Sequence, residues 1–350
     1  MRIAVDAMGS DRAPYVEVHG AVIASMSSGM EVLLVGDERE LKPTLAAYRK
    51  PHRVSVVHAS EVIRMDDPPA KAIRQKKDSS LLVALRLAKE GKVDGFVSAG
   101  NTGAVMMGAR TVLGPIRGVA RSAICQALPT SKNPVLVLDL GANVDCTVRH
   151  LCEFAEMGMV YSERVFGVRN PRVGLLNIGE EQAKGNEIAK AVHSSLNAVD
   201  HINFIGNVEP KGLYSGVADV VVCDGFIGNL VLKTSEAVGS LMSALLKREL
   251  SSTWMSKFGA LLSMGAYRRL KKAVDPNEYI GAPLLGVNGN VIICHGASSA
   301  RGICNAIQGA CRAAETAVNI HIRDGIQKLR ETEALRKHFE GDTASGTSGS

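Results

Sequence analysis

The chain has 350 residues, a net charge of +6 at neutral pH and a hydrophobic content of 46%. This length suits one large α/β domain or two lobes, and the mild positive charge is not that of a nucleic-acid-binding protein. A strand pattern begins at the first residues without a signal peptide, and no apolar run reaches the roughly 18 residues of a transmembrane helix, so we expect a cytoplasmic protein.

Short apolar runs alternate with helical patterns along the chain. Strands are predicted at 2–6, 31–35, 53–58, 93–98, 135–140, 173–178, 202–205, 217–223 and 291–294. Helices are predicted at 13–30, after Asp37, after Pro68, from Ser79 to Gly91, and at 102–113, 148–166, 181–197, 229–250 and 299–320. This alternation predicts an α/β fold, a three-layer α/β/α sandwich with a mostly parallel sheet.

Residues 1–335 are expected to form a single catalytic domain, possibly with two lobes. The last ten residues, 341–350, are small and polar, which predicts a disordered tail.

Five of the predicted strands end in turns rich in glycine and in amide or hydroxyl side chains. The turns are AGNTGA with Gly100, Asn101, Thr102 and Gly103; GANVDC with Asn143; GEEQAKGN with Lys184; DGFIGN with Asp224 and Asn229; and HGASSAR with His295 and Arg301. A single turn of this kind is usually structural. Because parallel strands end at one edge of a sheet, we expect the five turns together to line one anion-binding cleft.

The stretch RVGLLNIGEEQAKGN, residues 172–186, carries the turn around which the functional interpretation is organised. Its apolar run breaks at Gly179, and a helix is predicted from about Glu181 with Lys184 in its first turns. Such a strand–glycine–helix unit presents backbone N–H groups and a positive helix end to an anion, and the lysine adds a charge. The alternative is an ordinary turn with a solvated lysine.

Several common kinds of site are missing from the sequence. There is no G-x-G-x-x-G after a strand, no G-x-x-x-x-G-K-[ST] and no G-x-S-x-G. The seven cysteines form no C-x-x-C pair, and several lie in apolar runs, which favours buried thiols in a reducing compartment over a zinc site. We therefore expect neither a cofactor nor a metal.

Six segments resemble the phosphate acyltransferase family of bacterial phospholipid synthesis: SAGNTGA, DLGANVDC, RVGLLNIGEEQAKGN, FIGNVE, GVADVVVCDGFIGN and GAPLLGVNGNVIICHG. The resemblance extends from Met1 to about Ile320. It implies a fold of the isopropylmalate-dehydrogenase type, a homodimer, and transfer of a fatty acyl group from acyl-acyl-carrier-protein to orthophosphate. The acyl phosphate would then pass to the membrane glycerol-3-phosphate acyltransferase.

The chain departs from the family pattern in two turns. The first loop reads MGSDRAP where the family usually has MGGDHAP, so Ser10 and Arg12 replace a glycine and a histidine. HGASSAR also stands where HGSSNAR is commoner.

Acyl transfer to phosphate makes modest demands on a site. Orthophosphate already carries nucleophilic oxygens and a thiolate is a good leaving group, so the site must mainly supply orientation and oxyanion stabilisation. We expect Lys184 and Asn229 to be the catalytic pair, as the resemblance also suggests. Binding of phosphate or substrate is expected at Gly100, Asn101, Thr102, Gly103, Asn143, Asp224 and His295, although a lone histidine at a strand end is more often structural.

Three other functions use parts of the same pattern. One is a phosphotransacetylase-like transfer between a coenzyme A thioester and phosphate. The second is a metal-dependent hydroxyacid dehydrogenase, for which Asp6, Asp11, Asp139 and Asp224 are the available carboxylates. The third is a non-catalytic module that binds acyl lipid or a carrier protein and has no need of Lys184.

An amphipathic helical hairpin is predicted at about 245–275. Trp254, Phe258, Leu261 and Leu262 fall on one helical face. The basic residues that flank it are Lys247, Arg248, Lys257, Arg268, Arg269, Lys271 and Lys272. The hairpin either faces the core or a dimer partner, or it touches the bilayer and attracts anionic lipid or the acidic carrier protein. We expect reversible, peripheral association with the membrane.

Overall fold

The computed structural model describes residues 1–49, 53–274, 281–333, 335–336 and 338–339. The predicted disordered tail and the side chains of 270–274, with the predicted basic residues Lys271 and Lys272, lie outside the described part. Eleven strands form one sheet in the order β3-β2-β1-β4-β11-β10-β5-β6-β9-β7-β8.

The strands are β1 (Arg2–Asp6), β2 (Glu31–Gly36), β3 (Val54–His58), β4 (Gly95–Ser98), β5 (Ala123–Leu128), β6 (Val135–Leu138), β7 (Val173–Leu176), β8 (Phe204–Val208), β9 (Val220–Val222), β10 (Ala282–Leu285) and β11 (Val291–Ile293). The helices are α1 (Tyr15–Ser28), α2 (Glu38–Ala46), α3 (Pro69–Gln75), α4 (Ser80–Lys89), α5 (Thr102–Val112), α6 (Val148–Phe166), α7 (Glu187–Asn197), α8 (Pro210–Leu213), α9 (Gly225–Ser252), α10 (Trp254–Leu262), α11 (Met264–Val274), α12 (Ala300–Glu315) and α13 (Val318–Glu331).

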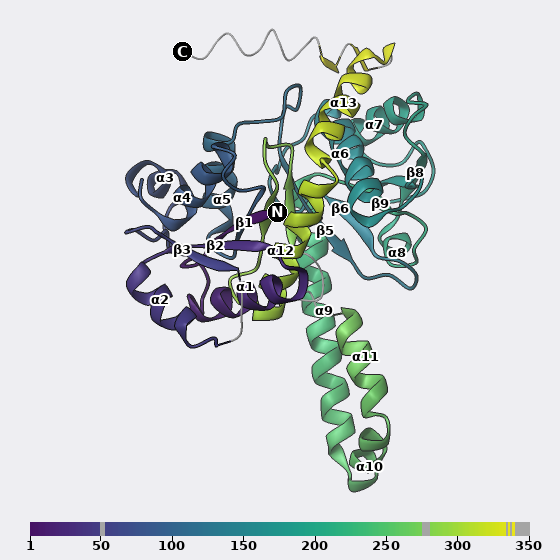
Figure 1. Ribbon diagram of the computed structural model, residues 1–350. Helices are drawn as coiled ribbons and strands as arrows, with labels where there is room; N and C mark the ends of the chain where they lie inside the picture. The colour runs from purple at the N-terminus through teal and green to yellow at the C-terminus, as the bar shows by residue number, and fades with distance from the viewer. Residues whose placement is uncertain (50–52, 275–280, 334, 337, 340–350) are drawn as a thin grey trace.

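Helices cover both faces of the sheet, because the strands are apolar on both sides. In β6, Val137 faces a core that it shares with α3, α4 and α5, whereas Leu138 faces the core under α6 and α13. In β1, Val5 points into a third core under α1 and α12. The predicted α/β/α layering is thus confirmed (Figure 1).

The direction of the strands changes within the sheet. β1, β2, β3, β4 and β11 run one way, and β6, β7, β8 and β9 run the opposite way. Three antiparallel pairings cause the reversal: β11 with β10, β10 with β5, and β5 with β6. The sheet is mostly parallel, as predicted, but β5 and β10 were not predicted, and they divide it into two oppositely directed halves.

This reversal separates the five turns. AGNTGA and HGASSAR follow β4 and β11 at one edge of the sheet, whereas GANVDC, GEEQAKGN and DGFIGN follow β6, β7 and β9 at the other edge. The prediction of one shared edge is therefore wrong. We call the first group, with the loop 7–14 after β1, the glycine edge, and the second group the lysine edge.

Three predicted helices have clearly different bounds in the structure. The helix predicted at 229–250 begins at Gly225, so Asn229 lies inside α9 and not at its start. The helix predicted at 181–197 begins only at Glu187, because Gly185 has a φ of +91° and Asn186 caps the helix by accepting from the Ala189 N–H at 2.8 Å. The helix predicted at 299–320 divides into α12 and α13 at Ala317, whose φ is +49°.

The helices α9, α10 and α11 form an arm that projects from the sheet and its covering helices (Figure 1). Within α9 only Gly225 and Gly228 are buried, and α10 buries no residue at all. The part of the chain that the structure describes contains no helix with the length and hydropathy needed to cross a bilayer.

Candidate functional site

Asp139 organises the turn after β6 at the lysine edge. Its fully buried carboxylate accepts hydrogen bonds from the backbone N–H groups of Ile124 and Ala142 and from both nitrogens of Asn143, at 2.7–3.1 Å. Burial raises the pKa of Asp139, and these donors lower it only in part. Asn143 also donates to the carbonyl of Ser122 at 2.8 Å, so its side-chain N–H groups hold the turn in place.

The first turn of α9 packs directly on this turn. The Gly225 N–H donates to the carbonyl of Asn143 at 2.8 Å. A Cβ at Gly228 would lie 1.8 Å from the carbonyl oxygen of Asp139, so only glycine fits there. Asp224 caps the helix by accepting from the Ile227 N–H at 2.8 Å.

Asn229 stands next to this contact and is exposed. A Cβ added at Gly141 would lie 3.7 Å from Asn229 Cγ, so the Asn229 side chain lies beside the turn after β6. The Asn229 amide makes no hydrogen bond to another described residue, so it is available to a ligand.

Lys184 lies in the loop between β7 and α7, and not in a helix as predicted. Two asparagines hold this loop: Asn177 donates to the carbonyl of Lys184 at 3.1 Å, and Asn207 donates to that of Glu181 at 2.8 Å. The lysine stem crosses Gly179, where a Cβ would lie 2.7 Å from Lys184 Cγ. Lys184 is exposed, and its ammonium forms no ion pair within the described ranges.

Sequence reasoning missed Asn177 and Asn207 as supports of the lysine loop. Both lie within segments that carry the family resemblance, NIGEE and FIGNVE, at the ends of adjacent strands. The available signal was an asparagine at the end of each of two predicted strands within these segments.

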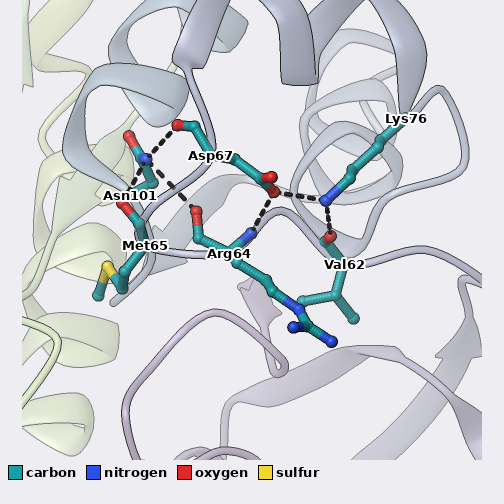
Figure 2. Close-up of polar contacts among 6 residues, drawn as sticks. All are labelled: Val62, Arg64, Met65, Asp67, Lys76 and Asn101. Carbon is teal, nitrogen blue, oxygen red and sulfur yellow. Dashed lines mark hydrogen bonds and ion pairs between the residues drawn. The ribbon is translucent and has the colours of Figure 1, made fainter.

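At the glycine edge, the Asn101 side chain is already engaged within the protein (Figure 2). Its oxygen caps α5 by accepting from the Ala104 N–H at 3.0 Å, and its nitrogen donates to the carbonyls of Met65 and Asp67 at 2.9 and 3.0 Å. Asp67 accepts in turn from the Arg64 N–H and pairs with Lys76. Asn101 therefore holds the loop 62–67 over α5, and only its backbone remains for a ligand.

The glycines of AGNTGA serve close packing. A Cβ at Gly103 would lie 2.8 Å from Pro69 Cγ, and a Cβ at Gly9 would lie 2.8 Å from the Cα of Gly100. Their small size is thus needed for packing α5 against α3 and against the first loop. Thr102, the first residue of α5, is exposed.

The first loop and the turn after β11 are clamped together. Arg12 donates to the carbonyls of Ala297 and Ser298 at 3.2 and 2.8 Å, so the departure from the family pattern has a structural role. His295 is exposed, and its Nδ1 accepts from the Ala297 N–H at 3.1 Å. Arg301, also exposed, lies in the first turn of α12.

Two carboxyl groups are buried beneath the first loop. Asp6 accepts from the hydroxyls of Ser80 and Ser98 at 2.6 and 2.8 Å, and burial raises its pKa. Burial also raises the pKa of Glu17 to about 7, because neither of its oxygens has a hydrogen bond of good geometry, and Ser10 and Arg12 offset the burial only in part.

The described residues contain no cluster of three His, Cys, Asp or Glu side chains suited to a metal ion. The carboxylate oxygens of Asp6 and Asp139 accept hydrogen bonds from donors within the chain. All seven cysteines are buried. A cavity of about 600 Å³ lies between the end of α6 and the start of α13, with Arg164 and His321 in its lining, and it includes none of the predicted site residues.

Known proteins resemble this chain over most of its length. A family model described as a fatty acid synthesis protein matches residues 1–321. A phosphate acyltransferase from Dictyoglomus turgidum is 47% identical over 333 residues, which cover 95% of this chain and 99% of the relative. Another from Moorella thermoacetica is 49% identical over 312 residues, with 89% and 92% covered.

Solved structures share the fold at low identity. A phosphotransacetylase from Streptococcus pyogenes superposes with a TM-score of 0.59 at 16% identity, covering 93% of this chain and 94% of that one. A 4-hydroxythreonine-4-phosphate dehydrogenase from Klebsiella pneumoniae gives 0.52 at 15% identity, covering 90% and 99%. At such identity the likeness shows the fold alone.

Proposed function

The chain belongs to the phosphate acyltransferase family and is an acyltransferase, and from this premise we propose that it moves a fatty acyl group from acyl-acyl-carrier-protein to orthophosphate. One observation carries the proposed site. At the lysine edge, Lys184 and Asn229 are exposed with unengaged polar ends, whereas the side chains of Asn143 and Asp224 are used to build the turns around them.

The proposed step needs no protein nucleophile. A phosphate oxygen attacks the thioester carbonyl carbon, and the C–S bond breaks as the carrier's thiolate leaves. The Lys184 ammonium would neutralise phosphate or the developing oxyanion, and the Asn229 amide would donate a hydrogen bond to the acyl oxygen or the phosphate. Groups positioned before the reaction stabilise such charge without reorganisation, which is why a lysine and an amide are sufficient.

Acyl-phosphate formation from palmitoyl-carrier-protein and phosphate tests this proposal. We expect turnover with the carrier thioester, and little turnover when palmitoyl-coenzyme A replaces it or when phosphate is omitted. Equal or faster reaction with the coenzyme A thioester would favour the phosphotransacetylase-like alternative. Product formation that requires NAD⁺ would favour a dehydrogenase, and binding without product would favour the non-catalytic module.

The arm supports a proposal of membrane contact. Trp254, Phe258, Leu261 and Leu262 are 60–78% exposed in α10, and Arg268 and Arg269 are exposed in α11. Apolar side chains beside cations suit an anionic bilayer surface or an acidic carrier protein. Residues 1–335 would then act as the catalytic unit of a homodimer that delivers acyl phosphate to the membrane glycerol-3-phosphate acyltransferase.

Co-sedimentation with anionic phospholipid vesicles tests the membrane contact. Trp254→Glu with Phe258→Glu should abolish sedimentation with the vesicles, because each substitution puts a negative charge where an apolar side chain at the tip of the arm would contact the bilayer. The matched control is Ser240→Glu with Ser243→Glu, which adds the same charge to exposed positions of α9 and should keep most of the binding. Equal binding by the tip variant and the wild type would refute the contact.

A further inference from the structure

The backbone of Lys184 is held at both of its polar groups. Its N–H donates to the carbonyl of Glu181 at 3.0 Å, and its own carbonyl accepts from the Asn177 side chain at 3.1 Å. The Glu181 carbonyl also accepts from the Asn207 side chain, at 2.8 Å. The turn 181–184 is therefore fastened to the end of β7 through Asn177 and to β8 through Asn207, although the residues of the turn itself are exposed.

A bulge in β8 aims Asn207 at this turn. Between the pairs Val173–Phe204 and Leu175–Asn207, β7 advances by two residues and β8 by three. Gly206 lies in this irregular step, and its φ of +91° is a conformation that favours glycine. Because side chains alternate between the two faces of a sheet, one extra residue moves Asn207 to the face of Leu175, which α7 covers. The loop that leads into α7 lies within reach on that face.

The amide of Asn207 is buried at a cost in stability. The residue is 7% exposed, and its Oδ1 is buried without a hydrogen-bond partner in the described part of the chain. A buried amide with an unpaired oxygen is less favourable than an apolar side chain of similar size. The bond that its nitrogen donates to the turn before Lys184 is therefore what an asparagine supplies at this position and a leucine would not.

The lysine stem has little freedom of its own. A Cβ at Gly179 would lie 2.7 Å from Lys184 Cγ and 3.2 Å from its Cδ, so the stem lies against this buried glycine. Since the backbone is held on both sides and the stem packs on Gly179, the position of the turn determines where the ammonium stands. A charge that is in place before the reaction stabilises the transition state without reorganisation.

We propose that Asn207 is a positioning residue for the acyl transfer: through the Glu181 carbonyl it fixes the turn that places the Lys184 ammonium, and it contacts neither substrate itself. This inference rests on the proposed function of Lys184. It differs from a structural role in a measurable way. Asn207 matters for turnover only while Lys184 is present, and it adds nothing to the stability of the fold.

A double-mutant cycle tests the proposal, with acyl-phosphate formation from palmitoyl-carrier-protein and phosphate as the assay. Asn207→Leu keeps the approximate size of the side chain and removes its donor. We expect kcat to fall about 10- to 100-fold, the KM for the carrier thioester to stay unchanged, and the melting temperature to equal or exceed that of the wild type. In a Lys184→Ala background the same substitution should lower kcat by less than about 2-fold, because the group that Asn207 positions is gone.

Two further variants sharpen the cycle. Asn203→Leu is the matched control, because Asn203 lies just before β8 and donates to the carbonyl of Asn170 at 3.1 Å, away from the lysine loop. It should leave kcat unchanged. Asn207→Asp keeps the shape of the side chain, but a carboxylate accepts and cannot donate. It should repeat the loss of kcat and its dependence on Lys184, and it takes the place of the leucine variant if that variant does not fold.

The inference is overturned if the Asn207 variants turn over at near wild-type rates, if they lose the same factor with and without Lys184, or if Asn203→Leu shows an equal loss. Failure of both Asn207 variants to fold would also overturn it, because the residue would then serve the fold. In each of these cases wild-type activity and its loss in Lys184→Ala would still stand, so the proposed function is judged separately. Wild-type turnover by Lys184→Ala itself would overturn both.

Discussion

Glu17 provides the sharpest quantitative test of the structure. Its carboxyl is completely buried in the first turn of α1 beneath the first loop, and its pKa is raised from 4.5 to about 7. A raised carboxyl pKa contributes stability that is fully present below pH 4.5 and is lost as the pH rises through 7, because the unfolded chain ionises first. Glu17→Gln keeps the shape and removes the ionisation.

The size of the effect follows from the shift. The difference of about 2.5 pKa units corresponds to about 3 kcal/mol at pH 8, and to only about 0.2 kcal/mol at pH 4. Glu17→Gln should therefore be more stable than wild type at pH 8, by about 3 to 6 °C in melting temperature, and nearly equal to it at pH 4.

Thermal unfolding followed by circular dichroism at several pH values measures this difference. Glu187→Gln is the control, because that carboxylate is exposed and should give a small change at every pH. A stability difference for Glu17→Gln that does not vary between pH 4 and pH 8 would refute the assigned burial of an ionisable group.

Four further outcomes are expected. Lys184→Ala and Asn229→Ala should fold normally, and the lysine variant should lose on the order of 10² to 10³ in turnover; near wild-type rates would remove these residues from the chemistry. Thr102→Val should raise the apparent KM for phosphate while Thr102→Ser preserves it, a cleaner comparison than Gly103→Val, which would strike Pro69; equal KM values would remove the hydroxyl from the site. Gly228→Ala should destabilise the protein by more than about 3 kcal/mol, because the added Cβ would clash with the Asp139 carbonyl. Gly239→Ala has open space around it and should be neutral or slightly stabilising. Similar melting temperatures for the two variants would contradict the packing at the root of α9. Activity should survive EDTA, since Asp6 and Asp139 are engaged within the chain; loss of activity that Mg²⁺ or Mn²⁺ restores would favour the metal-dependent alternative.

Much of the local structure could be read from the sequence, because it depends on neighbouring residues. The helix predicted at 148–166 appears with those bounds, and the strand predicted at 135–140 forms β6 at 135–138. Asp37 caps α2 by accepting from the Arg39 N–H at 2.9 Å. The motif residues at strand ends and the exposed tip of the arm were also found from the pattern alone.

The sequence could not predict which polar side chains form hydrogen bonds within the protein and which stay available to a ligand. Asn101 and Asn229 both lie in glycine-containing motifs that follow strands, yet the Asn101 side chain bonds to the distant loop 62–67 and the Asn229 side chain bonds to no other described residue. The carbonyls that accept from the Asn101 side-chain nitrogen are 34 to 37 residues away in sequence, so no local pattern predicts these bonds.

The sequence by itself determined the family, the alternation of strands and helices, and which residue types stand at the strand ends. Only the tertiary structure decided which of those ends share an edge. That outcome depends on β5 and β10, whose pairing joins Ala123 to Leu285 and reverses the chain direction between the two halves of the sheet. Local patterns set backbone conformation and burial, whereas the direction of a strand is set by hydrogen bonds to residues far away in the sequence.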